Sequence, residues 1–225
     1  MKERRKDGKK VSIIIVDDHP IVRHGIAQLI NKQKDMEITG EASSIAEGWD
    51  AIVKVSPDLV IVDLTLENES GLDLIRGIKD RCTGISVLVL SMHDESIFAE
   101  RAFRAGASGY VMKHEGTEKL IGAIRRIVEG DLYASDNLKE KLLKRIVKGT
   151  PLAVESSDSV DALSNRELEV FQMIGRGLTT REIADKLHLS VKTIEAHRQN
   201  IKDKLGLANA NELIRNAVQW LQGQG

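Results

Sequence analysis

Carboxylates stand at the ends of two apolar runs in the first third of the chain. Asp63 ends one run, and the pair Asp17 and Asp18 follows the run 11–16. Three carboxylates that come close together repel one another. They stay ionised only beside a cation, and their hard oxygen atoms select Mg²⁺ or a similar ion. Taken alone, Asp17 and Asp18 could equally cap a helix that begins near Pro20, so both interpretations are open at this point.

Two further polar residues end later apolar runs. Ser91 ends the fourth run and Lys113 ends the fifth. A phosphoryl group on Asp63 would require a cation, an ammonium group and a hydroxyl donor around its oxygens, because phosphoryl transfer depends mainly on positioning and charge neutralisation. Singly, Ser91 could be an ordinary strand end and Lys113 a solvated surface charge. Together they favour a phosphoryl site on Asp63.

The positions of these polar residues depend on the strands and helices that carry them. From residue 11 to about residue 130, short apolar runs alternate with amphipathic stretches, and the runs are 11–16, 36–42, 59–62, 85–90 and 109–112. Five strands alternating with helices predict an α/β domain, a doubly wound five-stranded parallel sheet covered on both faces. Ligands bind at the carboxyl edge of such a sheet, so we expect the polar residues to meet there. The first intervening helix should carry a stripe of Ile21, Ile26, Leu29 and Ile30.

Beyond residue 130 the strand pattern stops, and residues 131–160 are predicted to form a linker. Its helix has the apolar stripe Leu138, Leu142, Leu143, Ile146 and Val147. A short polar stretch without periodicity, from Ala153 to Asp161, is typical of a flexible tether.

The last part of the chain, residues 161–225, is all helical by pattern. Ser164 and Glu167 form a capping box at its first helix. Thr179 or Thr180 can cap the next helix, and Ser190 caps a third that runs over 191–205. A small all-α domain is therefore predicted after the linker.

The composition limits the classes of protein that fit. The chain has 225 residues, of which 41% are hydrophobic and 30% charged, and a single cysteine, Cys82, so a reducing cytoplasm is expected. The basic start, residues 2–10, precedes an apolar run of only six residues, which argues against export or a membrane span. Residues 11–130 carry 13 basic and 19 acidic side chains, whereas residues 176–204 carry 7 basic and 4 acidic ones. The acidic segment, residues 11–130, and the basic segment, residues 176–204, are therefore separate parts of the chain.

The helix over 191–205 has two unlike faces. Ile194, Ile201 and Leu205 share one face with Arg198, and the opposite face carries Lys192, Glu195, Ala196, Gln199 and Asp203. With the short helix and tight turn before it, this pattern favours a helix-turn-helix whose second helix enters the major groove. Six basic residues would neutralise phosphates: Arg181, Lys186, Lys192, Arg198, Lys202 and Lys204. The alternatives are a bundle used only for dimerisation and an ordinary solvated face.

The acidic half resembles a known family. Asp17, Asp18, Asp63, Ser91, Tyr110 and Lys113 have the order and spacing of the receiver domain of bacterial two-component response regulators, over residues 11–130. The resemblance implies that Asp63 is the phosphoacceptor. It also implies that Mg²⁺ is bound directly by Asp18, Asp63 and the backbone carbonyl of Thr65, and through water by Asp17.

The same resemblance assigns a switch. Ser91 and Tyr110 would be the pair in which the hydroxyl moves onto the phosphoryl group and the ring turns inward, while Lys113 pairs with the phosphoryl oxygens. The chain departs from the family after Asp63, where Met-Pro is common but Leu66 and Glu67 stand here. We expect Glu67 and Glu69 to alter phosphoryl stability or kinase access.

The segments Leu163 to Val170, Thr180 to Ala184 and Leu189 to His197 closely resemble the LuxR-type DNA-binding domain. With the receiver, they resemble the NarL/FixJ class of transcriptional regulators. The resemblance implies base contacts by Lys192, Glu195, Ala196 and Gln199, and backbone contacts by Thr180, Thr193, His197, Arg198 and Lys202. The last helix, from about Asn209 to Leu221, would serve dimerisation.

The resulting prediction is a cytoplasmic, phosphorylation-activated transcriptional regulator. Its partners would be a histidine kinase, double-stranded promoter DNA, a second copy of the chain when phosphorylated and, as a further candidate, RNA polymerase. It would catalyse only its own phosphotransfer and dephosphorylation. Two alternatives differ in class. A hydrolase of the aspartyl-phosphate type would need an acidic residue where Thr65 stands. A DNA-binding regulator with a phosphate-independent receiver would not need the intact set of Asp18, Asp63, Ser91 and Lys113.

Overall fold

The computed structural model describes residues 9–66, 69–140 and 160–223. The chain divides into two compact units, Met1–Lys144 and Arg145–Gly225. Each unit is described by itself below.

The first unit is built on a five-stranded parallel sheet. Its strands are β1 Val11–Val16, β2 Met36–Ala42, β3 Leu59–Val62, β6 Ser86–Ser91 and β7 Gly109–Met112. They lie in the order β2-β1-β3-β6-β7, so the predicted doubly wound sheet is confirmed. The fourth strand begins one residue later than predicted and includes Ser91. Val16 pairs with Val62, and this register places Asp17 beside Asp63 at the carboxyl edge.

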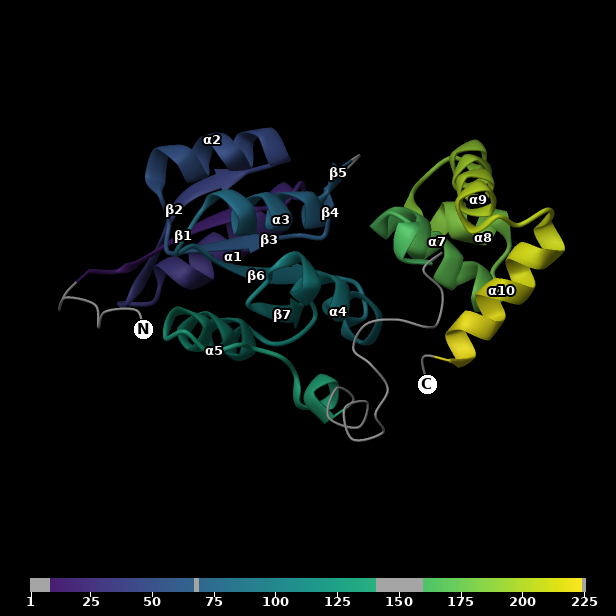
Figure 1. The fold of residues 1–225 in the computed structure, drawn as a ribbon. Coiled ribbons are helices and arrows are strands. Elements are labelled where there is room, and N and C mark those ends of the chain that lie inside the picture. Colours follow the sequence, from purple (N-terminus) through teal and green to yellow (C-terminus); the bar gives the residue numbers. More distant parts are fainter. Residues whose placement is uncertain (1–8, 67–68, 141–159, 224–225) are drawn as a thin grey trace. The chain divides into compact units, whose positions relative to one another are not determined.

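Helices cover both faces of this sheet (Figure 1). They are α1 Pro20–Asn31, α2 Ile45–Val55, α3 Gly71–Arg81, α4 Glu95–Ala105 and α5 Thr117–Val128. A buried hydrophobic cluster joins α1 and α5 to one face of the sheet. Gly48 of α2 lies against Val16 and Leu74, so α2 and α3 pack together over the sheet's other face. The core thus closes around the strands and leaves their carboxyl ends to carry polar residues.

One residue of the predicted α1 stripe was wrongly placed. Ile26 and Ile30 are buried, but Ile21 is 88% exposed. Five positions separate Ile21 from Ile26, and at 3.6 residues per turn that spacing turns a side chain by about 140°. Ile21 therefore faces away from the core.

A short hairpin that the sequence did not indicate follows Asp63. Its strands are β4 Thr65–Leu66 and β5 Glu69–Ser70, which pair antiparallel. The Ile45 N–H, at the start of α2, donates to the Glu69 carboxylate at 2.8 Å. A carboxylate is favourable at a helix N-terminus, so this bond ties the hairpin to α2. Glu67, the other acidic residue predicted to matter here, lies outside the described residues.

Only the first part of the predicted linker is described. Residues 136–140 are helical and Leu138 is buried. The rest of the predicted stripe, Leu142, Leu143, Ile146 and Val147, lies outside the described residues, as does the tether as far as residue 159. The residues that follow, Val160–Ala162, form a short 3₁₀ turn, η1.

The second unit contains four helices within the described part of the chain: α7 Asn165–Gly175, α8 Thr180–Leu187, α9 Val191–Leu205 and α10 Ala210–Gln222. The predicted capping box of Ser164 and Glu167 is present. Thr179, not Thr180, caps α8, and Ser190 caps α9. A Cβ atom on Gly175 would lie 2.5 Å from the carbonyl oxygen of Ala217, so this glycine lets α7 and α10 pack closely.

No helix in the described part of either unit combines the length and the apolar composition that a membrane span requires.

Candidate functional site

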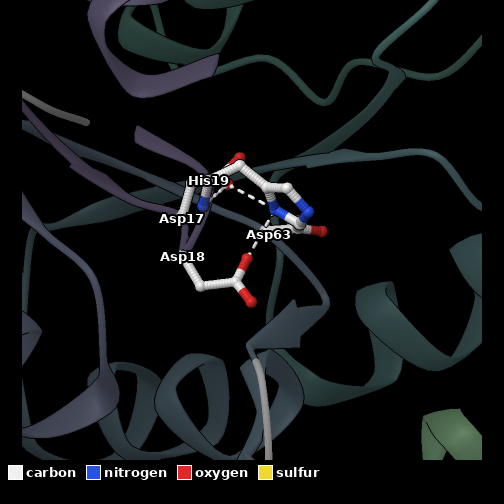
Figure 2. Close-up of side chains that lie close together, drawn as sticks. All are labelled: Asp17, Asp18, His19 and Asp63. Atoms are coloured by element: carbon white, nitrogen blue, oxygen red, sulfur yellow. Dashed lines mark hydrogen bonds and ion pairs between the residues drawn. The ribbon is translucent and has the colours of Figure 1, made fainter. Parts of the chain in front are cut away.

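An acidic cluster lies at the carboxyl ends of β1 and β3. Asp17, Asp18, His19 and Asp63 each offer a ligand atom, and these atoms lie within 4.8 Å of one another (Figure 2). Asp17 and Asp63 are buried, with 2% and 5% of their surface exposed. Buried carboxylates this close require positive charge nearby, and their oxygens are the donors that Mg²⁺ prefers. The donor set therefore fits a divalent cation.

Lys113 supplies one positive charge from the end of β7. Its Nζ lies 2.5 Å from the Asp63 carboxylate and 2.7 Å from that of Asp17, and only 8% of its side chain is exposed. Burial lowers the pKa of Lys113, but the charge of Asp63 and the hydrogen bonds to both carboxylates outweigh burial, so the net shift is upward. Lys113 is therefore charged at neutral pH.

The pKa of Asp63 is also raised, but here burial outweighs the charge of Lys113. Burial raises the pKa of its carboxyl to about 6, and the charge of Asp17 adds to the rise, while Lys113 works against it. The Thr65 N–H also donates to Asp63 Oδ1 at 3.3 Å. An added cation would offset the cost of burying the carboxylate.

The capping interpretation of Asp17 and Asp18 is wrong in its simple form. The N-cap of α1 is His19, whose side chain makes no capping bond. Asp17 Oδ1 accepts from the His19 N–H at 2.8 Å, and Asp18 Oδ1 lies 2.6 Å from His19 Nδ1. Asp17 thus binds the backbone of the N-cap residue, and Asp18 binds the side chain of the same residue. Sequence reasoning passed over His19, although its position directly after the acidic pair was the available signal.

The switch residues predicted from the resemblance are Ser91 on β6 and Tyr110 on β7, the strands that follow β3 across the sheet. Ser91 and Tyr110 are fully buried. The His93 N–H donates to Ser91 Oγ at 3.2 Å, and the Tyr110 hydroxyl donates to the carbonyl of His93 at 2.8 Å. Burial raises the pKa of the Tyr110 hydroxyl, which therefore stays protonated.

His93 contacts Ser91, Tyr110 and Thr65. This role was not predicted from the sequence. His93 Nε2 lies 2.7 Å from Thr65 Oγ1, and the His93 ring stacks on Phe98 of α4 at 4.5 Å between centroids. A lone histidine after a strand gives no distinctive pattern, so nothing in the sequence marked it. This contact holds the Thr65 side chain.

In the second unit, α8 and α9 form the predicted helix-turn-helix. Ile194 and Ile201 are buried and fix α9 against the rest of the unit. The residues predicted to face bases, Lys192, Glu195, Ala196 and Gln199, are all exposed. The predicted backbone contacts are half-buried: Thr180, Thr193, His197, Arg198 and Lys202. The exposed face of α9 thus matches a surface that could enter a groove.

Some side chains of α9 already have hydrogen-bond partners or a shifted pKa within the second unit. Gln199 donates to Asp203 at 2.8 Å, so its amide must exchange this partner to bind a base edge. Thr193 Oγ1 lies 2.7 Å from Ser190 Oγ. Burial lowers the pKa of His197, with the charge of Arg166 adding to the effect, so its neutral form is favoured.

A doubly wound sheet with an acidic edge and a buried lysine, followed by a helix-turn-helix, defines a response regulator that binds DNA. Comparison with family models agrees in both units. Residues 13–125 match the response regulator receiver domain, and residues 161–217 match the bacterial regulatory proteins of the LuxR family. The chain belongs to the response regulators that combine these two domains.

Individual relatives cover nearly the whole chain. The oxygen regulatory protein NreC of Staphylococcus carnosus (strain TM300) is 36% identical over 211 residues, which is 93% of this chain and 97% of that protein. A LuxR-family two-component response regulator from Aurantimonas sp. SI85-9A1 is 34% identical, with a TM-score of 0.58 over 62% of this chain and 99% of its own. A structure of two RcsB dimers bound to two parallel DNAs is 25% identical, with a TM-score of 0.57 over 94% and 98% of the two chains.

Proposed function

We propose that Asp63 is the phosphoacceptor of this response regulator and that its phosphorylation controls dimerisation and promoter binding. The observation that carries the proposal is the position of Lys113, whose ammonium group lies between the carboxylates of Asp63 and Asp17. A phosphoryl group bonded to Asp63 would meet a fixed positive charge there.

The residues around Asp63 have distinct roles in the transfer from a phosphorylated histidine of the partner kinase. A carboxylate oxygen of Asp63 attacks phosphorus, the P–O bond forms, the P–N bond breaks and the electron pair leaves with the imidazole. Asp18, Asp63 and the Thr65 carbonyl would bind Mg²⁺ directly and Asp17 through water. When bound, the ion neutralises charge on the transferred group. Lys113 then pairs with phosphoryl oxygens, and the Ser91 hydroxyl turns toward them.

The proposal extends to the output. The domains would be a receiver over 11–130, a linker over 131–160 and a DNA-binding domain over 161–225, acting in the cytoplasm where the DNA lies. The exposed face of α9 would read bases, and its half-buried flank would contact the sugar-phosphate backbone. The only chemistry proposed for the receiver is its own phosphotransfer and dephosphorylation. RNA polymerase is a candidate partner at the promoter.

The first step is tested with acetyl phosphate and Mg²⁺, followed by mass measurement of the intact chain. We expect the wild type to gain one phosphoryl group and Asp63→Asn to gain none. Asp50→Asn is the matched control, because Asp50 is an exposed aspartate on α2, and it should behave like the wild type. A mass gain that survives Asp63→Asn would overturn the assignment.

The second step separates a phosphate-controlled regulator from one whose receiver is only a dimerisation module. Phosphorylated wild-type chain selects its sites from a pool of random duplex DNA. Affinity for the selected duplex is then compared with and without phosphorylation at one fixed salt concentration, because salt alone changes such affinities strongly. Equal affinities would favour the phosphate-independent alternative.

A further inference from the structure

The chain returns to the sheet after α5, at the start of the linker. Tyr133 forms a parallel bridge with Gly109 at the edge of β7. The Tyr133 N–H donates to the Ser108 carbonyl at 2.9 Å, and the Tyr110 N–H donates to the Tyr133 carbonyl at 3.2 Å. The backbone of the proposed switch residue Tyr110 therefore holds the first residues of the linker directly.

Gly109 makes this return geometrically feasible. A Cβ atom there would lie 2.6 Å from Ile127 Cδ1 and 3.1 Å from both Cβ and the carbonyl oxygen of Tyr133. Any side chain at this position would push the returning chain away from β7. The linker is thus packed against the receiver by a close backbone approach.

A second attachment joins the linker to α4. The Ser135 hydroxyl donates to Oε1 of Glu95, the first residue of α4. Ser135 Oγ also accepts the Leu138 N–H at 3.1 Å, so Ser135 caps the helical residues 136–140. Glu95 is buried, and within the described residues its second oxygen has no hydrogen-bond partner. A buried carboxylate left without its hydroxyl donor would be destabilised, so the Ser135 bond matters to both elements.

A short series of hydrogen bonds connects the Glu95–Ser135 attachment to the proposed switch residues. Ser91 Oγ accepts the His93 N–H, and Tyr110 donates to the His93 carbonyl. His93 and Asp94, the N-cap of α4, directly precede Glu95. If Ser91 turns toward a phosphoryl group, its bond to His93 must change, and the start of α4 is two residues further on. Hydrogen bonds have a short range, so such a shift either keeps or breaks the contact with Ser135.

We infer that the Glu95–Ser135 hydrogen bond is a coupling contact, through which the state of Asp63 controls the N-terminal end of the linker helix. The inference rests on the proposed function, since it requires phosphorylation of Asp63. Glu95 and Ser135 act as positioning residues: neither touches the phosphoryl group, and both set where the linker begins. The chain continues from this point toward the DNA-binding unit.

The test uses the full chain, four variants at Ser135 and Glu95, and one control variant. Ser135→Ala and Glu95→Ala remove the bond, whereas Ser135→Thr keeps the hydroxyl and Glu95→Gln keeps an acceptor oxygen. Glu118→Ala is the matched control, because Glu118 is an exposed glutamate in the first turn of the neighbouring helix α5. Phosphorylation is followed by mass, and amide hydrogen exchange of residues 136–140 is measured with and without beryllofluoride. Affinity is measured for the duplex selected by the phosphorylated wild type.

We expect every variant to accept a phosphoryl group as the wild type does. In the wild type, beryllofluoride should change hydrogen exchange at residues 136–140 and phosphorylation should change DNA affinity. In Ser135→Ala and Glu95→Ala the change in hydrogen exchange should be lost, and the ratio of the two affinities should shrink by about tenfold, as expected for one hydrogen bond to a charged group. Ser135→Thr, Glu95→Gln and the control should respond like the wild type.

The outcomes separate the inference from the proposed function. If Ser135→Ala is phosphorylated and its exchange and DNA affinity respond as in the wild type, the coupling role is wrong and the phosphoacceptor stands. If the wild type gains no phosphoryl group, the proposed function fails and the coupling role fails with it. A merely structural bond would change exchange equally in both states, so an unchanged difference between states also overturns the inference.

Discussion

Gly71 and Asp63 are in direct backbone contact. A Cβ atom on Gly71 would lie 2.0 Å from the carbonyl oxygen of Asp63 and 3.0 Å from the Cα atom of Leu64. The Gly71 N–H also donates to the Leu64 carbonyl at 3.0 Å. The start of α3 therefore fixes the backbone that carries the proposed phosphoacceptor, and only glycine permits this approach.

Gly71→Ala should displace Asp63. We expect the free energy of unfolding to fall by about 1–3 kcal/mol, as for other overpacked sites, and phosphorylation by acetyl phosphate to slow. Denaturant titration and mass measurement check both. The control is Gly122→Ala in α5, where an added Cβ would meet nothing within 4 Å. Alanine should stabilise that helix by roughly 0.5–1 kcal/mol. Equal stabilities of the two variants would contradict the prediction.

Asp63→Asn should stabilise the metal-free protein in a pH-dependent way. Burial raises the pKa of Asp63 from 3.8 to about 6, so the folded chain binds this proton more tightly than the unfolded chain. The associated stability is complete below the unfolded pKa of 3.8 and is lost as pH rises through about 6. Asparagine should therefore raise the free energy of unfolding by roughly 2–3 kcal/mol near neutral pH and by little at about pH 3.5. A gain that is the same at both pH values would exclude this cause.

Lys113→Met should tighten Mg²⁺ binding. The ammonium group occupies oxygens of Asp63 and Asp17 that the ion would also attract, and its charge repels a divalent cation. Removing it should lower the dissociation constant by about tenfold, which corresponds to a repulsion of roughly 1.4 kcal/mol between the ammonium group and the ion. Titration calorimetry checks the value. Lys119→Met, on the exposed part of α5, is the control. Weaker binding in Lys113→Met would show that Lys113 organises the carboxylates and does not compete for them.

Lys204→Met should destabilise the second unit above the pKa of Glu167. Lys204 Nζ lies 2.6 Å from the Glu167 carboxylate. Burial raises the pKa of Glu167, but the bonds from Lys204 and Ser164 lower it below 4.5 overall. The contribution of ionised Glu167 to the free energy of unfolding is therefore complete above pH 4.5. It is lost as the pH falls through the lowered pKa of Glu167 in the folded chain. We expect a loss of about 0.5–1 kcal/mol at neutral pH, since the lysine is partly exposed.

Trp220, which packs against Phe171 in the second unit, reports this unfolding when Trp49 is replaced by Phe. A loss that stays the same as the pH falls well below 4.5 would rule out the ion pair as the cause.

Substitutions on α9 should separate affinity from specificity. Lys202→Ala should weaken binding to all duplexes alike and reduce the slope of log affinity against log salt by about one, as for one lost phosphate contact. Gln199→Ala should instead reduce discrimination at one base pair by roughly 1–3 kcal/mol. Lys54→Ala, on α2 of the receiver, is the control. A change of salt slope with Gln199→Ala would place that residue at the backbone.

Much of the secondary structure of this protein could be predicted from local sequence patterns. The apolar runs that became strands and the capping serine and threonine residues are short-range features, so the sheet and the helices of the second unit could be predicted from neighbouring residues. The order of Asp17, Asp18, Asp63, Ser91 and Lys113 along those runs also predicted that they would share one edge, because parallel strands all end on the same side.

The tertiary structure decided which side chains at that edge touch. Lys113 lies 50 residues from Asp63 in sequence and still approaches it to 2.5 Å. The contacts of His93 with Thr65, of Glu69 with α2 and of Ser135 with Glu95 likewise join distant segments. Hydrogen bonds fail beyond a few tenths of an ångström of their ideal length. Only the packing of the crossover helices on the sheet sets positions to that precision, and no pattern along the chain encodes it.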